Sequence, residues 1–256
     1  MLQNERHRKI LNQLKVKHAV KVTELAKEMG ISESTILRDI NELDQMGKLK
    51  KVFGGAVSLS RETVSTEADV ASRNLINTEE KECIARYAAS LIGDNDFIFL
   101  DAGTTTEKII DYLEKKNATY VTNGITHAKK LIQRGFSVYM IGGLLRPSTE
   151  AVVGIPAIDT IRQYNFTKCF MGANGVDAER GFTTPDISEA AVKTAVMKQS
   201  EECFVLADSS KFGKVLPVTF ADLDEACILT DRLPNPIYRQ HTVIKEVKQD
   251  DIHADL

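Results

Sequence analysis

Six short apolar runs, alternating with amphipathic stretches, dominate the region after residue 95 of this 256-residue chain. Continuous apolar character over so few residues is typical of strands that are buried on both faces, as in parallel sheets covered by helices. The amphipathic stretches then serve as right-handed crossover helices. The sequence therefore predicts an α/β region with a Rossmann-like, largely parallel sheet. Its expected strands are residues 96–101, 118–123, 137–143, 167–174, 202–208 and 226–231.

The first run leads into the segment "DAGTTTEKII", residues 101–110. Gly103, Thr104, Thr105 and Thr106 precede a helix, so backbone N–H groups, hydroxyls and the helix dipole can face one anion. A plain capped turn between strand and helix is the alternative explanation. The Gly-Lys-Ser/Thr pattern of nucleotide hydrolases is absent from the sequence, which argues against an NTPase.

Four later strand ends are also polar or rich in glycine, and parallel strands bring such ends to one edge of the sheet. Each one alone is ordinary turn chemistry, but together they predict a binding site for a polar ligand. Arg146 and Lys211 suit a phosphate group, whereas Asp101, Asn123 and Asp208 suit sugar hydroxyls, because carboxylates repel phosphate. The remaining residues at these ends include Gly142 and Asn174.

The first 58 residues follow a helical period instead. Ile36, Ile40 and Leu43 recur at i, i+4 and i+7, which puts them on the buried face of one helix. Two similar apolar stripes precede it, in residues 4–16 and 22–29. Three short helices with this spacing predict a helix-turn-helix, whose third helix enters the major groove of DNA. On the exposed face of that helix we expect DNA contacts from Ser32, Ser34, Thr35, Arg38 and Asn41.

The segment "KLKKVFGGAVSL", residues 48–59, contains two short expected strands around Gly54 and Gly55. A glycine pair favours a two-residue hairpin in which both positions take positive φ. We expect this hairpin, including its glycines, to be a wing that contacts DNA beside the helix-turn-helix. The residues expected at the sugar-phosphate backbone are Lys48, Lys50 and Lys51.

The charge distribution supports a division of the chain. The formal net charge is −3, yet residues 1–61 contain 12 Lys and Arg against 7 Asp and Glu, while the remainder contains 21 against 29. A basic head on an acidic protein favours nucleic acid as a partner; a small helical bundle with a solvated basic surface is the alternative. We predict a winged helix-turn-helix domain at residues 1–58, a polar linker at 59–77 and a ligand-binding domain at 78–256.

The distribution of apolar residues and cysteines argues against a membrane protein, a secreted protein and a zinc-binding protein. No apolar run reaches the roughly 18 residues that a membrane span needs, and the first residues lack the apolar core of a signal peptide. We therefore expect a cytoplasmic protein without a membrane partner. Cys83, Cys169, Cys203 and Cys227 match no zinc spacing, and we expect neither a metal, nor a cofactor, nor a disulfide.

The segments "RHRKILNQL" and "VTELAKEMGISESTILRDINELDQMGKLKKVFGGA" resemble the amino-terminal domain of the DeoR family of bacterial transcriptional regulators. Two positions differ from the family's usual pattern: Leu37 stands in place of arginine and Phe53 in place of histidine, so the resemblance fixes no operator sequence. Further blocks are similar to the family's sensor domain, itself similar in fold to ribose-5-phosphate isomerase. These blocks are "DAGTTT", "VTNG", "IGGLLR", "FMGANGVD", "GFTTPDISEAAVK" and "VLADSSKFG".

The resemblance implies that the second domain binds a phosphorylated sugar or a related metabolite. It adds Glu189 and Lys193, which lie four residues apart on an expected helix. An exposed ion pair, contributing about 0.3 to 0.5 kcal/mol, is the alternative for these two residues. The complete set that the resemblance implicates is Asp101, Gly103, Thr104, Thr105, Thr106, Asn123, Gly142, Arg146, Asn174, Glu189, Lys193, Asp208 and Lys211.

Two functions fit these observations. The first is a repressor of a carbohydrate uptake or catabolic operon that leaves its operator when a phosphorylated sugar binds, with fructose 1-phosphate as the first guess. The second is a sugar-phosphate isomerase with a DNA-binding head. The related isomerases carry acidic residues in the block resembling "GANGVD", where this chain has Asn174 and Gly175, so we expect a regulator and no enzyme. Helix-turn-helix proteins read two half-sites, which predicts a homo-oligomer, at least a dimer.

Overall fold

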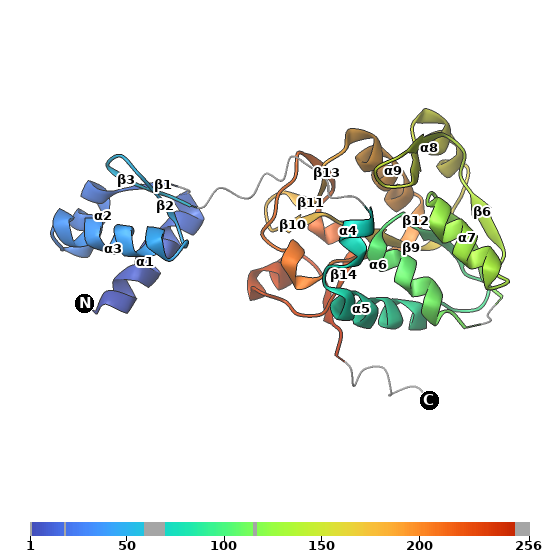
Figure 1. Cartoon of the computed structure of the whole chain (residues 1–256), viewed down its shortest axis with the longest axis horizontal. Helices are drawn as coiled ribbons and strands as arrows, with labels where there is room; N and C mark the ends of the chain where they lie inside the picture. Colours follow the sequence, from blue (N-terminus) through green and yellow to red (C-terminus); the bar gives the residue numbers. More distant parts are fainter. Residues whose placement is uncertain (1, 18, 59–69, 115–116, 249–256) are drawn as a thin grey trace. The chain divides into compact units, whose positions relative to one another are not determined.

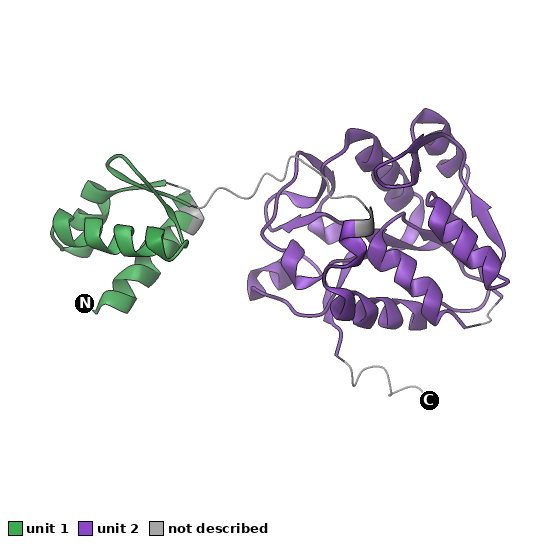
Figure 2. Cartoon of the chain, in the orientation of Figure 1, with its two compact units in different colours: residues 1–63 green, residues 64–256 purple. Residues whose placement is uncertain are grey.

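The computed structural model describes residues 2–17, 19–58, 70–114 and 117–248 of the chain. It divides into two compact units, residues 1–63 and residues 64–256, which Figure 2 shows in green and purple. The boundary falls inside the predicted linker, of which residues 59–69 lie outside the described residues. The remainder of that predicted linker belongs to the second unit and includes the short helix α4 (Val70–Asn74).

In its described residues, the first unit combines helices with a small antiparallel sheet. Its elements are α1 (Gln3–Lys17), β1 (Ala19–Lys21), α2 (Val22–Met29), α3 (Glu33–Gln45), β2 (Lys50–Val52) and β3 (Gly55–Val57). Ile10, Leu25, Ile36, Ile40 and Leu43 are fully buried in one core, because the helices turn their apolar stripes toward one another. This arrangement is the predicted winged helix-turn-helix, with β1 as an addition that makes a sheet of order β1-β3-β2.

The second unit is built on a seven-stranded sheet of order β15-β14-β12-β9-β4-β5-β6, whose neighbouring strands are all parallel. The predicted Rossmann-like sheet is confirmed, and each of the six predicted runs supplies a strand. The sequence does not predict β15, because Lys245 and Glu246 interrupt its apolar character. The strands are β4 (Phe97–Leu100), β5 (Thr119–Thr122), β6 (Val138–Met140), β9 (Phe166–Gly172), β12 (Ser200–Leu206), β14 (Cys227–Thr230) and β15 (Ile244–Glu246).

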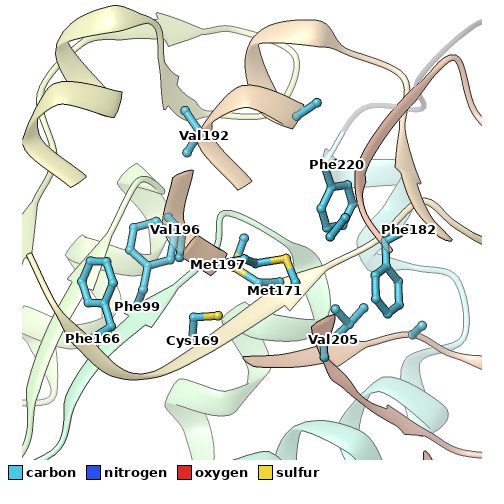
Figure 3. Close-up of a cluster of buried hydrophobic side chains, with 14 of the residues drawn as sticks. Phe99, Phe166, Cys169, Met171, Phe182, Val192, Val196, Met197, Val205 and Phe220 are labelled. Atoms are coloured by element: carbon cyan, nitrogen blue, oxygen red, sulfur yellow. The ribbon is translucent and has the colours of Figure 1, made fainter. Parts of the chain in front are cut away.

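Helices cover both faces of this sheet (Figure 1). Successive side chains of a strand point to opposite faces, so Phe99 packs in one core with α8 (Ile155–Ile161) and α9 (Ile187–Lys198); Figure 3 shows part of this core. Ile98 and Leu100 pack in the other core, with α5 (Thr78–Ser90), α6 (Thr104–Ile109) and α7 (Ile125–Gln133). Each fully buried large side chain contributes about 1.5 to 3 kcal/mol, and the two cores together fix the positions of the strand ends.

Two smaller antiparallel sheets complete the second unit. One is the hairpin of β7 (Leu144–Arg146) and β8 (Ala151–Val153), and the other contains β10 (Gly175–Asp177), β11 (Gly181–Thr184) and β13 (Val218–Ala221). The sequence does not predict these strands, because four of the five contain glycine, polar or charged residues and β8 is bordered by Glu150 and Gly154. Short 3-10 turns occupy residues 110–112, 209–211, 223–225 and 236–240. Within the described part of the chain, no helix has the length and apolar character that crossing a bilayer requires.

Candidate functional sites

The exposed face of α3 gathers the polar residues that the sequence predicts at DNA. Ser32 caps the helix, because its Oγ accepts a hydrogen bond from the Thr35 backbone N–H at 3.4 Å. The same Oγ lies 3.0 Å from Ser34 Oγ and 2.9 Å from Thr35 Oγ1. Further along, Arg38 and Asn41 are exposed. Hydroxyl, guanidinium and amide groups on one helix face suit phosphate oxygens and base edges in the major groove.

The hairpin between β2 and β3 forms the wing, with a turn that differs from the predicted one. Val52 pairs with Gly55, so the turn residues are Phe53 and Gly54, and of these only Gly54 has a positive φ, at 76°. Gly55 is buried in β3, where an added Cβ would lie 2.1 Å from the Val20 carbonyl oxygen. The prediction of a Gly54-Gly55 turn is wrong because β1, which the sequence does not reveal, requires glycine at the strand position. Gly55 therefore lets β1 pack closely against β3 and is not part of the turn.

The three lysines of the wing are exposed beside α3. Lys48 precedes β2, and Lys50 and Lys51 lie within it. The Lys51 backbone N–H donates to Asp44 Oδ1 at 2.9 Å, which fastens β2 to the end of α3. Lysine ammonium groups in such a position suit the sugar-phosphate backbone beside the groove. Their contact with DNA, like that of the α3 residues, stays a prediction.

A buried ion pair fixes α1 against α3. Asp39 is 1% exposed, and its carboxylate accepts hydrogen bonds from Arg6 Nε at 2.6 Å and Arg6 Nη2 at 2.8 Å. The imidazole of His7 lies 3.4 Å from the same carboxylate. Bidentate pairing of guanidinium with carboxylate is strong and directional. This pair therefore orients α3, although Asp39 is too buried to contact DNA itself.

The second candidate site is a cavity of about 80 Å³ in the second unit. It lies at the carboxyl ends of β4 and β9, where the strand order reverses, which is the usual place for a ligand in such sheets. Ten of the thirteen residues predicted at the effector site line it. These ten are Asp101, Gly103, Thr104, Thr105, Asn123, Asn174, Glu189, Lys193, Asp208 and Lys211.

One wall of the cavity is built around Asp101, which is 4% exposed. Its Oδ2 accepts hydrogen bonds from Lys193 Nζ and, at 3.0 Å, from the Gly172 backbone N–H. Lys193 also donates to the Gly172 carbonyl at 2.9 Å. Glu189, one turn earlier on α9, accepts from Thr149 Oγ1 at 2.7 Å. Since Glu189 and Lys193 are both buried, the alternative that they form an exposed ion pair is wrong.

A second group of lining residues is cationic: Arg73 on α4, Lys81 on α5, and Lys211 in the turn at 209–211. Burial, and after it repulsion from Lys211, lowers the pKa of Lys81 to about 8. Burial likewise lowers the pKa of Lys211. Arg73 lowers the pKa of both lysines further, and the Asp208 carboxylate offsets part of the effect. Because these cations repel one another, an anion placed between them gains from all three.

Asn77 connects the residues before α5 to the end of β12. It adopts a positive φ of 52°, which asparagine tolerates better than most residues. Its Nδ2 donates to Asp208 Oδ1 at 2.8 Å and to Ser210 Oγ at 3.2 Å. Asp208 is 2% exposed and also accepts from the Ser210 backbone N–H at 3.0 Å. Part of the predicted linker is therefore fastened into the cavity wall.

Sequence reasoning misses four polar lining residues, Arg73, Asn77, Lys81 and Thr149. Arg73 and Asn77 lie in a weakly patterned polar stretch, which is typical of a linker. A usable signal does exist for Lys81, because it shares the helical spacing of Ile84 and Ala88 and is buried with them. A lysine at a position of the apolar stripe indicates a buried charge, and buried charges gather at functional sites.

Three residues predicted at the effector site do not line the cavity. Thr106 is fully buried, and its hydroxyl bonds to the backbone of the preceding turn, where it caps α6. Gly142 is exposed in the loop after β6. Arg146 pairs with Asp186 and lies 3.6 Å from Glu189 Oε1, because β7 turns back as a hairpin toward the start of α9. Arg146 thus contacts the lining residue Glu189 without lining the cavity itself.

The cavity combines cations with buried carboxylates and amides, which fits a ligand that has an anionic group and several hydroxyls. In the described ranges, no three His, Cys, Asp or Glu side chains are grouped to hold a metal ion. The four cysteines are free thiols. The lining side chains and backbone groups of the cavity therefore suit a polar anion.

The two units of the structure match two different known protein domains. Residues 6–62 match the DeoR-like helix-turn-helix domain, and residues 76–232 match the DeoR C terminal sensor domain. The chain is 42% identical, over 97% of its length and all of the relative's, to the "Uncharacterized HTH-type transcriptional regulator FruR" of Bacillus subtilis (strain 168). It is 35% identical to the "Lactose phosphotransferase system repressor" of Staphylococcus epidermidis, over 83% of this chain and 86% of that one.

Among solved structures, ribose 5-phosphate isomerase A from Methanocaldococcus jannaschii is similar with a TM-score of 0.41 and 18% identity, over 53% of this chain and 55% of that chain. The sequence relatives are named as regulators and not as enzymes, so the prediction of a regulator without enzymatic function is confirmed. The matched domains cover both units of the structure. The chain belongs to the DeoR family of DNA-binding transcriptional regulators.

Proposed function

We propose that this regulator represses a carbohydrate uptake or catabolic operon and leaves its operator when a phosphorylated sugar occupies the cavity of the second unit. The observation that carries the proposal is the gathering of Arg73, Lys81 and Lys211 around one cavity. The lowered pKa values of both lysines mean that the site disfavours their charged forms, and a phosphate dianion reverses that preference. A neutral sugar gains nothing from this arrangement.

The charges also orient the ligand. The phosphate lies against the three cations, where each contributes a charge-assisted hydrogen bond or a close Coulombic contact. The sugar hydroxyls lie against Asp101, Asn123 and Asn174, which line the same cavity. Carboxylate and amide oxygens accept hydrogen bonds from hydroxyls, whereas a carboxylate repels phosphate. Asp101 therefore favours the sugar end of the ligand.

Similarity to a lactose phosphotransferase system repressor supports a carbohydrate operon as the target. We take fructose 1-phosphate as the first compound to test, followed by the phosphates of tagatose, galactitol and glycerol. The cavity's cations favour any of these over an unphosphorylated sugar. The positions of the sugar hydroxyls that hydrogen-bond to Asp101 and Asn123 discriminate among these sugar phosphates.

The DNA partner is an operator with two half-sites. Each chain contributes one α3, whose exposed polar face enters a major groove. Helix-turn-helix proteins place two such helices about 34 Å apart, one helical turn of DNA. We therefore propose at least a dimer that binds an inverted or direct repeat.

Thermal unfolding with a panel of sugar phosphates tests the effector. A ligand at 100 times its dissociation constant stabilises the folded state by about 2.7 kcal/mol, which raises Tm by about 5 to 10 °C for a domain of this size. Fructose and inorganic phosphate are the controls, and each is expected to give a smaller shift than fructose 1-phosphate or another active sugar phosphate. A panel in which no sugar phosphate exceeds inorganic phosphate contradicts the proposal.

A further inference from the structure

The two edges of the seven-stranded sheet differ in chemistry. At one edge, β15 contains Lys245 and Glu246, and Glu246 pairs with Arg239. Charged side chains on an edge strand commonly prevent pairing with another chain. At the other edge, β6 consists of valine, tyrosine and methionine and has no charge (Figure 1). The β6 edge lacks the protection that the β15 edge has.

An exposed apolar surface extends from β6 into the chain that follows it. We call the exposed side chains that border the β6 edge the β6–β7 face. They lie on both sides of the edge, because neighbouring residues of a strand point in opposite directions, and they are Tyr139 (58% exposed), Met140 (42%), Leu144 (69%), Leu145 (45%) and Ile155 (73%). Gly154, which precedes Ile155 in the chain, lies beside Leu144, because a Cβ added to Gly154 would lie 3.9 Å from Leu144 Cβ. From residue 137 to residue 157 the only charged residues in the sequence are Arg146 and Glu150. The face is therefore apolar and nearly uncharged.

The size of the β6–β7 face matches what a dimer needs. A large side chain presents roughly 150 to 250 Å² when fully exposed, so the five exposed fractions correspond to about 500 Å² of apolar surface. A standard interface buries about 800 Å² per partner, of which roughly 55 to 65% is apolar. Added over both sides of the edge, the five side chains reach about that apolar area.

We infer that the β6–β7 face is where a second copy of this chain docks. The inference rests on the proposed function, because an operator with two half-sites needs two copies of α3. A two-fold axis beside β6 places the face against its own copy. Both surfaces are apolar there, so docking buries no unpaired charge. The charged edge at β15 stays in solvent.

The same hairpin reaches the effector cavity. Thr149, between β7 and β8, is 5% exposed and donates to Glu189 in the cavity wall. Ala151 of β8 lines the cavity, and Arg146 of β7 pairs with Asp186 at the start of α9. The cavity wall and the docking face therefore share one structural element, the β7–β8 hairpin.

Sedimentation velocity of the full chain at micromolar concentration measures the association. Leu144→Glu and Ile155→Glu each place a charge in the contact and are expected to weaken the dimer about 100-fold or more. Val243→Glu is the matched control, because Val243 is 71% exposed beside β15 at the other edge of the sheet. We expect it to leave association unchanged. All three side chains are exposed in the single chain, so the variants should keep their fold, which far-UV circular dichroism checks.

Hydrogen–deuterium exchange of the unaltered protein gives an answer that does not depend on any variant. Amides in residues 138–145 are expected to exchange more slowly above the dimer's dissociation constant than below it. A monomeric protein, a dimer indifferent to both glutamate substitutions, or exchange independent of concentration overturns the inference. The proposed function is judged separately, by the Tm shift with sugar phosphates and by operator binding. A dimer through the β6–β7 face that responds to neither contradicts the proposed function and leaves the docking face standing.

Discussion

Each unit of this protein buries a carboxylate against a cation, yet the surroundings of the two pairs differ. Asp39 meets Arg6 between α1 and α3 and is 1% exposed, whereas Asp101 meets Lys193 at the wall of a cavity. A pair enclosed by protein can only hold helices together. A pair beside a cavity can exchange a partner for a ligand. The space next to the carboxylate, and not the pairing itself, separates a structural ion pair from a candidate binding group.

Lys193→Met is expected to have the largest effect on stability, because it leaves the Asp101 carboxylate buried without its cation. Removing one partner of a buried pair costs about 3 to 5 kcal/mol. Urea denaturation should show a loss of this size in the unfolding of the second unit. Lys198→Met, at an exposed position of the same helix, is the control and should change the free energy of unfolding by less than about 0.5 kcal/mol. Equal stability of the two variants would mean that the pair does not support the fold.

Arg6→Met should cost less, about 2 to 3 kcal/mol, since the Arg6 side chain is 16% exposed and His7 remains near Asp39. Operator affinity should fall together with the stability of the first unit, because the pair orients α3. The Tm shift with a sugar phosphate should stay as in the unaltered protein. Lys9→Met, exposed on the same helix, is the control. If Arg6→Met weakened effector binding instead, the pair would not be confined to the DNA-reading unit.

Lys211→Ala is expected to weaken binding of the sugar phosphate about 10- to 100-fold, the equivalent of roughly 1.5 to 3 kcal/mol for a charge-assisted hydrogen bond. Operator binding should be unchanged, so the variant should remain a repressor that no longer responds. Isothermal titration calorimetry measures the first quantity and fluorescence anisotropy of labelled DNA the second. Lys129→Ala, exposed on α7, is the control. Loss of DNA binding in Lys211→Ala would point to a structural role for the lysine.

The smallest expected effect is a dependence of effector affinity on pH. Burial lowers the pKa of Lys81 to about 8, and a phosphate beside it raises that pKa again. Between about pH 7 and pH 8 the ammonium is largely charged and the phosphate is a dianion, so the affinity is highest there. Above pH 8 binding must take up a proton, so the dissociation constant should rise by up to about tenfold per pH unit. Lys81→Arg should flatten this profile, because guanidinium stays charged, whereas a flat profile in the unaltered protein would exclude Lys81 from phosphate binding.

Periodicity predicts the parts of this fold that repeat a local pattern. The stripe of Ile36, Ile40 and Leu43 predicts α3, and six apolar runs predict six of the seven strands in the main sheet. β1 and β7 each contain only two apolar residues before a charged one, which is too little pattern to predict a strand. The wing turn shows the consequence, because the choice between Gly54 and Gly55 depends on the close approach of β1.

The residues that line the cavity likewise divide into those that the sequence predicts and those that it does not. Strand ends predict residues such as Asp101 and Asp208, because the end of a parallel strand has a known place in the fold. Arg73 and Asn77 join the cavity through the docking of a polar segment onto the second unit, and such docking has no local period. Lys81 lies between these cases, since its place in an apolar stripe is visible in the sequence but the cavity it faces is not.

Operator affinity measured with and without bound sugar phosphate tests most directly whether the second unit controls the first. Duplex DNA selected by the protein from a random pool provides the operator, and fluorescence anisotropy measures its dissociation constant. We predict that a sugar phosphate which raises the Tm weakens operator binding about 5- to 150-fold, or about 1 to 3 kcal/mol. Operator DNA should weaken binding of that sugar phosphate by the same factor. Unchanged operator affinity in the presence of every sugar phosphate that binds would contradict this prediction.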